Sequence, residues 1–156
     1  MQEKKYKYFM EWKYPYKTKP FEHQRTALNK SATSSAYAYF MEMGTGKTKT
    51  AIDNIGYLSL QKEIDTVLII APKSVYTIWS KEIEAHLPDV VGRDIFQWKV
   101  DKPKTWDRFL KSDKLKVFLM NVEALSGKNG FKEAQAFLKK FPNNFVVIDE
   151  STTIKN

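Results

Sequence analysis

Two patterns of apolar and polar residues alternate along this chain. Short apolar runs, VLII (residues 67–70) and FVVI (145–148), offer no polar side chain to either face, which is typical of parallel strands covered by helices on both sides. Between such runs lie segments with apolar residues at helical spacing. In the segment 47–61 these residues are Ala51, Ile52, Ile55 and Leu58.

Beyond residue 20, these patterns predict a regular succession of helices and strands. Helices are expected over residues 22–30, 47–61, 74–86, 104–111 and 131–140. Strands are expected over residues 36–40, 66–71, 94–100, 115–120 and 144–148. Alternation of this kind predicts an α/β fold of three layers with a mostly parallel sheet in the middle.

The helix expected over residues 74–86 has one apolar face. Ser74 is the expected N-cap. The face toward the core is expected to consist of Val75, Ile78, Trp79, Ile83 and Leu87. We therefore interpret Trp79 as a packing residue, and we assign no function to Trp98 and Trp106.

Composition narrows the class of protein. The chain has 156 residues, enough for one domain or part of one, and it has no cysteine, which excludes disulfides and cysteine-based metal sites. The longest purely apolar stretch, residues 67–71, is far too short to cross a bilayer, and the N-terminus lacks the apolar segment of a signal peptide. We expect a protein without a membrane partner, cytoplasmic in a bacterial or phage-infected cell, or nuclear in a eukaryote.

Positive charge is concentrated at the N-terminus. The net charge of +8 favours a polyanionic partner, and residues 1–19 hold six lysines against two acidic residues. The aromatic residues interleaved with these lysines are Tyr6, Tyr8, Phe9, Trp12, Tyr14 and Tyr16. They would either stack on nucleic-acid bases or pack on the domain while the lysines face water, and we favour the packing interpretation. Residues 1–19 are thus expected to be an extension of a single lobe spanning 20–156.

A phosphate cradle is predicted where the strand 36–40 runs into MEMGTGKT (residues 41–48). Gly44 and Gly46 can adopt backbone angles that turn successive N–H groups around an anion at a helix N-terminus. In such a loop, Lys47 would reach the β- and γ-phosphates and the Thr48 hydroxyl would bind Mg²⁺. Met41 stands where the strict pattern has its first glycine, but the strand before the loop and the helix after it supply the required context.

The second half of the expected ATP site is FVVIDE (residues 145–150). Asp149, at the end of a buried strand, would support the metal. Glu150 would orient or deprotonate an attacking water, which suits hydrolysis. Two alternatives remain open: a P-loop enzyme unrelated to DNA, such as a small-molecule kinase, or a non-catalytic nucleic-acid or protein-binding module with a vestigial ATP site.

Four segments in order resemble the first RecA-like lobe of superfamily 2 helicases and translocases, most closely the Swi/Snf-type branch with its compact phage members. The segments are KPFEHQ (19–24), similar to the Q motif, MEMGTGKT, similar to motif I, LIIAPKSVYTIWSKEI (68–83), similar to motif Ia, and VVIDESTTIKN (146–156), similar to motif II. VFLMNVEALS (117–126) is more weakly similar to motif Ib.

The resemblance implies a set of ligands. It implies ATP and Mg²⁺ as cofactors, with Gln24 on the adenine and nucleotide contacts from Met43, Gly44, Thr45, Gly46, Lys47 and Thr48. It implies DNA, in duplex form, as the partner. Its backbone would be contacted by Lys73 and Ser74, and more weakly by Asn121. Lys73 and Ser74 are equally compatible with a solvated loop.

The chain also departs from this family. Ser151 and Thr152 follow the acidic pair where the family often has histidine, and the sequence stops at Asn156, before motif III and the second lobe with its arginine fingers. We therefore expect the N-terminal portion of a DNA translocase, incomplete at the C-terminal end of its sheet, that binds MgATP weakly and turns it over poorly alone. An open sheet edge would favour self-association.

Overall fold

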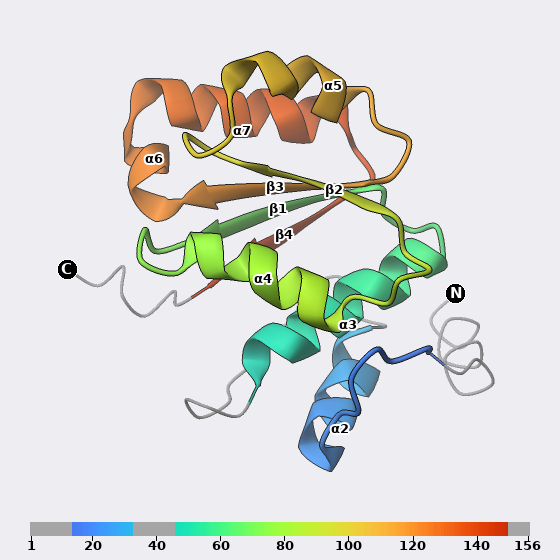
Figure 1. Cartoon of the computed structure of the whole chain (residues 1–156). Helices are drawn as coiled ribbons and strands as arrows, with labels where there is room; N and C mark the ends of the chain where they lie inside the picture. The colour runs from blue at the N-terminus through green and yellow to red at the C-terminus, as the bar shows by residue number, and fades with distance from the viewer. Residues whose placement is uncertain (1–13, 33–45, 150–156) are drawn as a thin grey trace.

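A parallel sheet forms the centre of the molecule in the computed structural model, which describes residues 14–32 and 46–149 (Figure 1). Within these residues the sheet has four strands in the order β2-β3-β1-β4, and each neighbouring pair is parallel. The strands are β1 (Thr66–Ala71), β2 (Arg93–Gln97), β3 (Leu115–Asn121) and β4 (Asn144–Ile148). The predicted α/β class is confirmed, whereas the strand expected over residues 36–40 lies outside the described part.

Helices cover both faces of this sheet (Figure 1). One layer contains α3 (Lys47–Leu60) and α4 (Tyr76–His86), with α2 (Glu22–Ser31) packed on α3. The opposite layer contains α5 (Trp106–Leu110), which follows a short 3₁₀ turn, together with α6 (Val122–Ser126) and α7 (Lys128–Lys140).

Successive residues of the central strands point into different cores. Val67 and Ile69 of β1 join the core beneath α3 and α4, while Leu68 and Ile70 join the core beneath α5 and α7. Every residue of β1 is buried. The uninterrupted apolar run of this strand therefore reflects burial on both faces.

Strands were easier to predict than the start of α4. β1 and β4 have the predicted bounds, but α4 begins at Tyr76 and not at Ser74. The N–H groups of Val75 and Tyr76 both donate to the Pro72 carbonyl, at 2.9 and 3.0 Å, so Ser74 lies in a turn and Val75 is the N-cap. The N-cap prediction for Ser74 is wrong because Pro72 supplies the acceptor that begins this turn.

Two other predictions need correction. Ile78, expected in the core, is 48% exposed on the outer side of α4. The strand expected over residues 94–100 ends at Gln97, where the Asp101 carboxylate accepts the Gln97 N–H at 2.7 Å and closes a turn. Pattern alone did not reveal these local hydrogen bonds.

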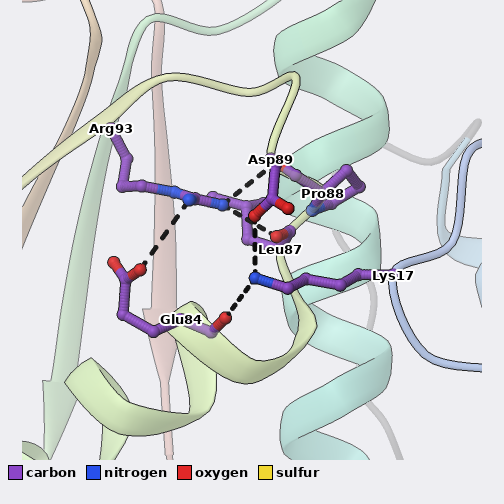
Figure 2. Close-up of polar contacts among 6 residues, drawn as sticks. All are labelled: Lys17, Glu84, Leu87, Pro88, Asp89 and Arg93. Atoms are coloured by element: carbon purple, nitrogen blue, oxygen red, sulfur yellow. Dashed lines mark hydrogen bonds and ion pairs between the residues drawn. The ribbon is translucent and has the colours of Figure 1, made fainter.

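Residues 14–18 lie along α3 and beside the C-terminal end of α4. Tyr14 is buried and Tyr16 packs edge-on against it, with ring centroids 4.8 Å apart. Lys17 Nζ donates to the Glu84 carbonyl at 2.7 Å and to Asp89 Oδ1 at 2.8 Å (Figure 2). These two aromatic side chains thus pack on the domain, which is the arrangement that we favoured.

β4 is an outer strand of the described sheet, bonded to β1. Its side chains Val146 and Ile148, which share a face with the α7 layer, are 40% and 56% exposed. Self-association through this edge stays a prediction. None of the helices in the described ranges has both the length and the apolar character needed to span a bilayer.

Candidate nucleotide-binding site

The N-terminus of α3 contains Gly46, one of the two glycines of the predicted phosphate cradle. Gly46 is the N-cap, with φ of 80° in the left-handed region that glycine adopts without strain. The N–H and the hydroxyl of Thr50 both donate to the Gly46 carbonyl at 3.1 Å, which holds this residue in place. Lys47 is exposed and Thr48 half-buried in the first turn, where a bound anion would meet the helix N-terminus.

The rest of the predicted cradle lies outside the described residues. This applies to Met41 and to three predicted nucleotide contacts, Met43, Gly44 and Thr45. The site is therefore built here from Gly46, Lys47 and Thr48.

Gln24 of α2 lies directly against the cradle. A Cβ added to Gly46 would be 2.0 Å from Gln24 Nε2, so any side chain at position 46 would displace the glutamine. Gln24 is buried, and its Oε1 accepts the Phe21 N–H at 2.8 Å. The structure thus brings together two segments that are far apart in sequence and were predicted to serve one nucleotide.

Asp149 follows β4 at the carboxyl end of the sheet. Its N–H donates to the Ile70 carbonyl at 2.8 Å and continues the ladder between β1 and β4. Its Oδ2 accepts a hydrogen bond from Trp79 Nε1 at 2.9 Å. The strands point toward the side on which α3 begins (Figure 1), the side where open parallel sheets bind ligands. Glu150 lies outside the described residues.

Trp79 is the residue whose role the sequence analysis missed. We interpreted it as packing, and it is indeed buried in the core at 3% exposure. Its indole N–H nevertheless contacts a predicted metal-binding residue. The available signal was chemical, because a buried indole N–H usually requires an acceptor.

The donor set fits Mg²⁺. A threonine hydroxyl and a carboxylate are the hard oxygen ligands that this ion prefers. Within residues 14–32 and 46–149, no group of three His, Cys, Asp or Glu side chains forms a metal cluster. A cation between Thr48 and Asp149 would therefore take further ligands from phosphate or water, as Mg²⁺ does in P-loop sites.

The predicted DNA contacts lie at the ends of β1 and β3. Lys73 and Ser74 are exposed in the turn after β1, and Asn121 ends β3 opposite Ala71 in the register. Asn121 Nδ2 donates to Glu123 Oε2 at 3.1 Å.

Glu123 was not predicted as part of this group. Its pKa is lowered by a hydrogen bond from its own backbone N–H, by the Asn121 amide, and also by Lys73. The Asn121 amide therefore binds this carboxylate, and Lys73 favours its charged form. Its charge opposes phosphate binding unless Lys73 offsets it.

Comparison with known proteins identifies the family of this chain. The family model of the SNF2-related domain matches residues 28–156. The chain is 31% identical over 116 residues to the ISWI chromatin-remodeling complex ATPase ISW1 of Saccharomyces cerevisiae. It is 28% identical over 116 residues to the probable ATP-dependent DNA helicase CHR23 of Arabidopsis thaliana. Each alignment covers 74% of this chain but 10% of the relative. The chain belongs to the family of the SNF2-related domain, and its resemblance to the Swi/Snf-type branch is thereby confirmed.

Proposed function

We propose that this chain is the ATP-binding N-terminal lobe of a DNA-dependent ATPase that couples ATP hydrolysis to movement on DNA. The observation that carries the proposal is the left-handed Gly46 at the start of α3, followed by Lys47 and Thr48, in a fold whose Asp149 ends a parallel strand. Membership of the family, together with the relatives named as an ATPase and an ATP-dependent helicase, supports ATP as the nucleotide.

Each described residue has a distinct role in this proposal. Lys47 binds the β- and γ-phosphates, and the backbone at Gly46 lets the phosphates approach closely. Thr48 and Asp149 hold Mg²⁺, which neutralises charge on the phosphate oxygens when bound. Gln24 binds the adenine. For that role the Gln24 amide either turns away from Gly46 or donates to the adenine from Nε2, the atom that lies against Gly46.

Residues beyond the described ranges complete the proposed site. Met43, Gly44 and Thr45 contribute backbone N–H groups to the cradle. Glu150 orients the attacking water and accepts its proton.

DNA binding is proposed for Lys73, Ser74 and Asn121. Lys73 and Ser74 are exposed and would contact phosphates, which position a protein on DNA without reading its sequence. The negative charge of Glu123 makes this surface less positive. We therefore expect the phosphate contact to be made chiefly by Lys73. Weak turnover by the chain alone, a requirement for a second lobe and a cytoplasmic or nuclear location all remain predictions.

The decisive experiment measures nucleotide binding and ATP hydrolysis by the 156-residue chain, with and without duplex DNA. Lys47→Ala should abolish MgATP binding. Lys132→Ala removes the same charge from α7, on the opposite face of the sheet, and should change nothing (Figure 1). Binding with little turnover supports one lobe of a motor. Absence of MgATP binding in the wild-type chain, or equal binding by Lys47→Ala, would overturn the proposal.

DNA contact has its own test. Lys73→Ala should weaken duplex binding and reduce its salt dependence, since each phosphate contact contributes roughly one unit to the slope of log affinity against log salt. If Lys73→Ala bound duplex DNA as tightly as wild type and with the same salt dependence, Lys73 would not be part of the DNA-binding surface.

A further inference from the structure

Asp149 is held at its main chain and at its side chain by different parts of the fold. Its N–H is fixed to the Ile70 carbonyl at 2.8 Å, which sets where the backbone leaves β4. This contact leaves the side-chain rotamer open. The indole N–H of Trp79, on α4, restricts the Asp149 rotamer because it donates to Oδ2 at 2.9 Å.

We propose that Trp79 is a positioning residue for the Asp149 carboxylate, holding it in the orientation that receives Mg²⁺. This inference rests on the proposed function, because it assigns a role within the same site. It adds Trp79 of α4 to the proposed site, a residue that belongs neither to the P-loop nor to the acidic strand.

The chemistry of the donor suits this role. An indole N–H donates one hydrogen bond and accepts none, so it engages a single carboxylate oxygen and leaves Oδ1 available to a cation or its water. The indole is also uncharged. Unlike a lysine or arginine at the same place, it orients the carboxylate without neutralising the charge that attracts the metal.

The rigidity of Trp79 strengthens the argument. Trp79 is 3% exposed and lies in the same core as Ile83 of this helix and Leu87, which follows the helix. A donor held by core packing loses little further freedom when it bonds the carboxylate. Partners of this kind, which orient a ligand without touching the metal, typically change metal affinity about 10- to 100-fold when removed.

Trp98 provides a matched comparison within the same chain. Its Nε1 is buried without a hydrogen-bond partner in the described part of the structure. Trp79→Phe and Trp98→Phe therefore remove the same ring atoms, but only the first removes a hydrogen bond.

The first test separates metal binding from nucleotide binding. ADP binding is measured in EDTA and across a Mg²⁺ titration for wild type, Trp79→Phe and Trp98→Phe. We expect Trp79→Phe to bind ADP normally in EDTA but to need about 10-fold more Mg²⁺ for the metal-dependent gain in affinity. Trp98→Phe should match wild type. An unchanged Mg²⁺ midpoint in Trp79→Phe, or an equal loss of ADP binding with and without Mg²⁺, would overturn the inference and leave the proposed function intact.

A second measurement keeps Trp79 in place and changes its acceptor, so it does not depend on the stability of Trp79→Phe. The indole ¹⁵N–¹H resonances are compared between wild type and Asp149→Asn, without nucleotide. Loss of the charged acceptor should shift one indole resonance, that of Trp79, and leave the Trp98 resonance in place. No selective shift would overturn the inference. Failure of wild type to show any Mg²⁺-dependent ADP binding would overturn both this inference and the proposed function.

Discussion

Lys49 and Asp53 form an ion pair inside the molecule, one turn apart on α3. Lys49 Nζ is 2.7 Å from Asp53 Oδ2, and the side chains are only 8% and 2% exposed. The centroid of the Tyr16 ring lies 5.3 Å from Lys49 Nζ. Asp53 Oδ1 has no hydrogen-bond partner among the described residues. The pair therefore recovers only part of the cost of removing two charges from water.

Loss of one partner should be far worse than loss of both. Asp53→Ala leaves the Lys49 charge buried and should lower the free energy of unfolding by about 3 to 5 kcal/mol. The double variant Lys49→Met/Asp53→Leu replaces the pair with apolar side chains of similar volume and should be close to wild type or more stable. Urea unfolding measures both. A double variant as unstable as Asp53→Ala would contradict this account.

The same pair predicts a pH dependence of stability. Burial raises the pKa of Asp53 from 3.8 to about 6, although its hydrogen bond and ion pair with Lys49 oppose the shift. The native state then binds this proton more tightly than the unfolded chain. The stability contributed by the group is full below pH 4 and is lost as pH rises through 6.

The pH effect is best measured as a difference between two proteins. Relative to Lys49→Met/Asp53→Leu, wild type should lose up to about 3 kcal/mol of stability between pH 4 and 7. Asp89 and Glu123, whose pKa values are lowered by Lys17 and by a backbone N–H respectively, act in the opposite direction. They are present in both proteins and cancel. If the difference in stability between the two proteins were constant from pH 4 to 7, the pKa of Asp53 would not be raised.

Gly56 is predicted to be intolerant of alanine for a tertiary reason. In a helix interior, Gly→Ala normally stabilises by about 1 kcal/mol. Here the added Cβ would lie 2.1 Å from Tyr14 Oη, so Tyr14 must move from its buried position. We expect Gly56→Ala to destabilise by about 1 to 3 kcal/mol.

Two controls isolate that contact. In a Tyr14→Ala background, Gly56→Ala should become neutral or stabilising. Gly92→Ala should have little effect, since its Cβ would meet Lys114 Cγ at an ordinary 3.4 Å. If Gly56→Ala were equally destabilising in the Tyr14→Ala background, its effect would not come from the clash with Tyr14. Thermal or urea unfolding of each variant provides the measurement.

Arg93 should matter more for stability than its neighbour Lys17 (Figure 2). Arg93 Nη2 donates to the Leu87 and Pro88 carbonyls at 2.7 and 3.0 Å, which ties β2 to the end of α4. Lysine has no planar guanidinium to hold a nitrogen at the Nη2 position between these two carbonyls, so Arg93→Lys should cost about 1 to 3 kcal/mol.

Lys17→Ala should change stability little, because its ion pair with Asp89 is exposed, and the part of the effect that comes from this pair should vanish in high salt. Unfolding at low and high salt distinguishes the two residues. Equal effects from Arg93→Lys and Lys17→Ala would show that the carbonyl contacts are not structurally important.

The amino-acid pattern alone was sufficient for the bounds of β1 and β4 and for the left-handed glycine at the start of α3. Both strands are continuous apolar runs. The expected burial on both faces holds for β1, whereas β4 is exposed at Val146 and Ile148, so composition predicted the environment of β1 but not that of β4. Gly46 was likewise predictable, because few other residues adopt its left-handed angle.

Tertiary structure decided which polar groups met one another. Lys49 and Asp53, spaced one turn apart, would be typical of a solvated helix face, but α2 and residues 14–18 cover that side of α3. The sequence predicted Trp79 to be a core residue, and it is one. That its N–H meets Asp149 depends on the register of β4 against β1 and on where α4 crosses the sheet. Hydrophobic periodicity specifies which side of an element is buried, whereas hydrogen-bond partners depend on how separate elements are placed together, and that placement is not encoded in any one segment.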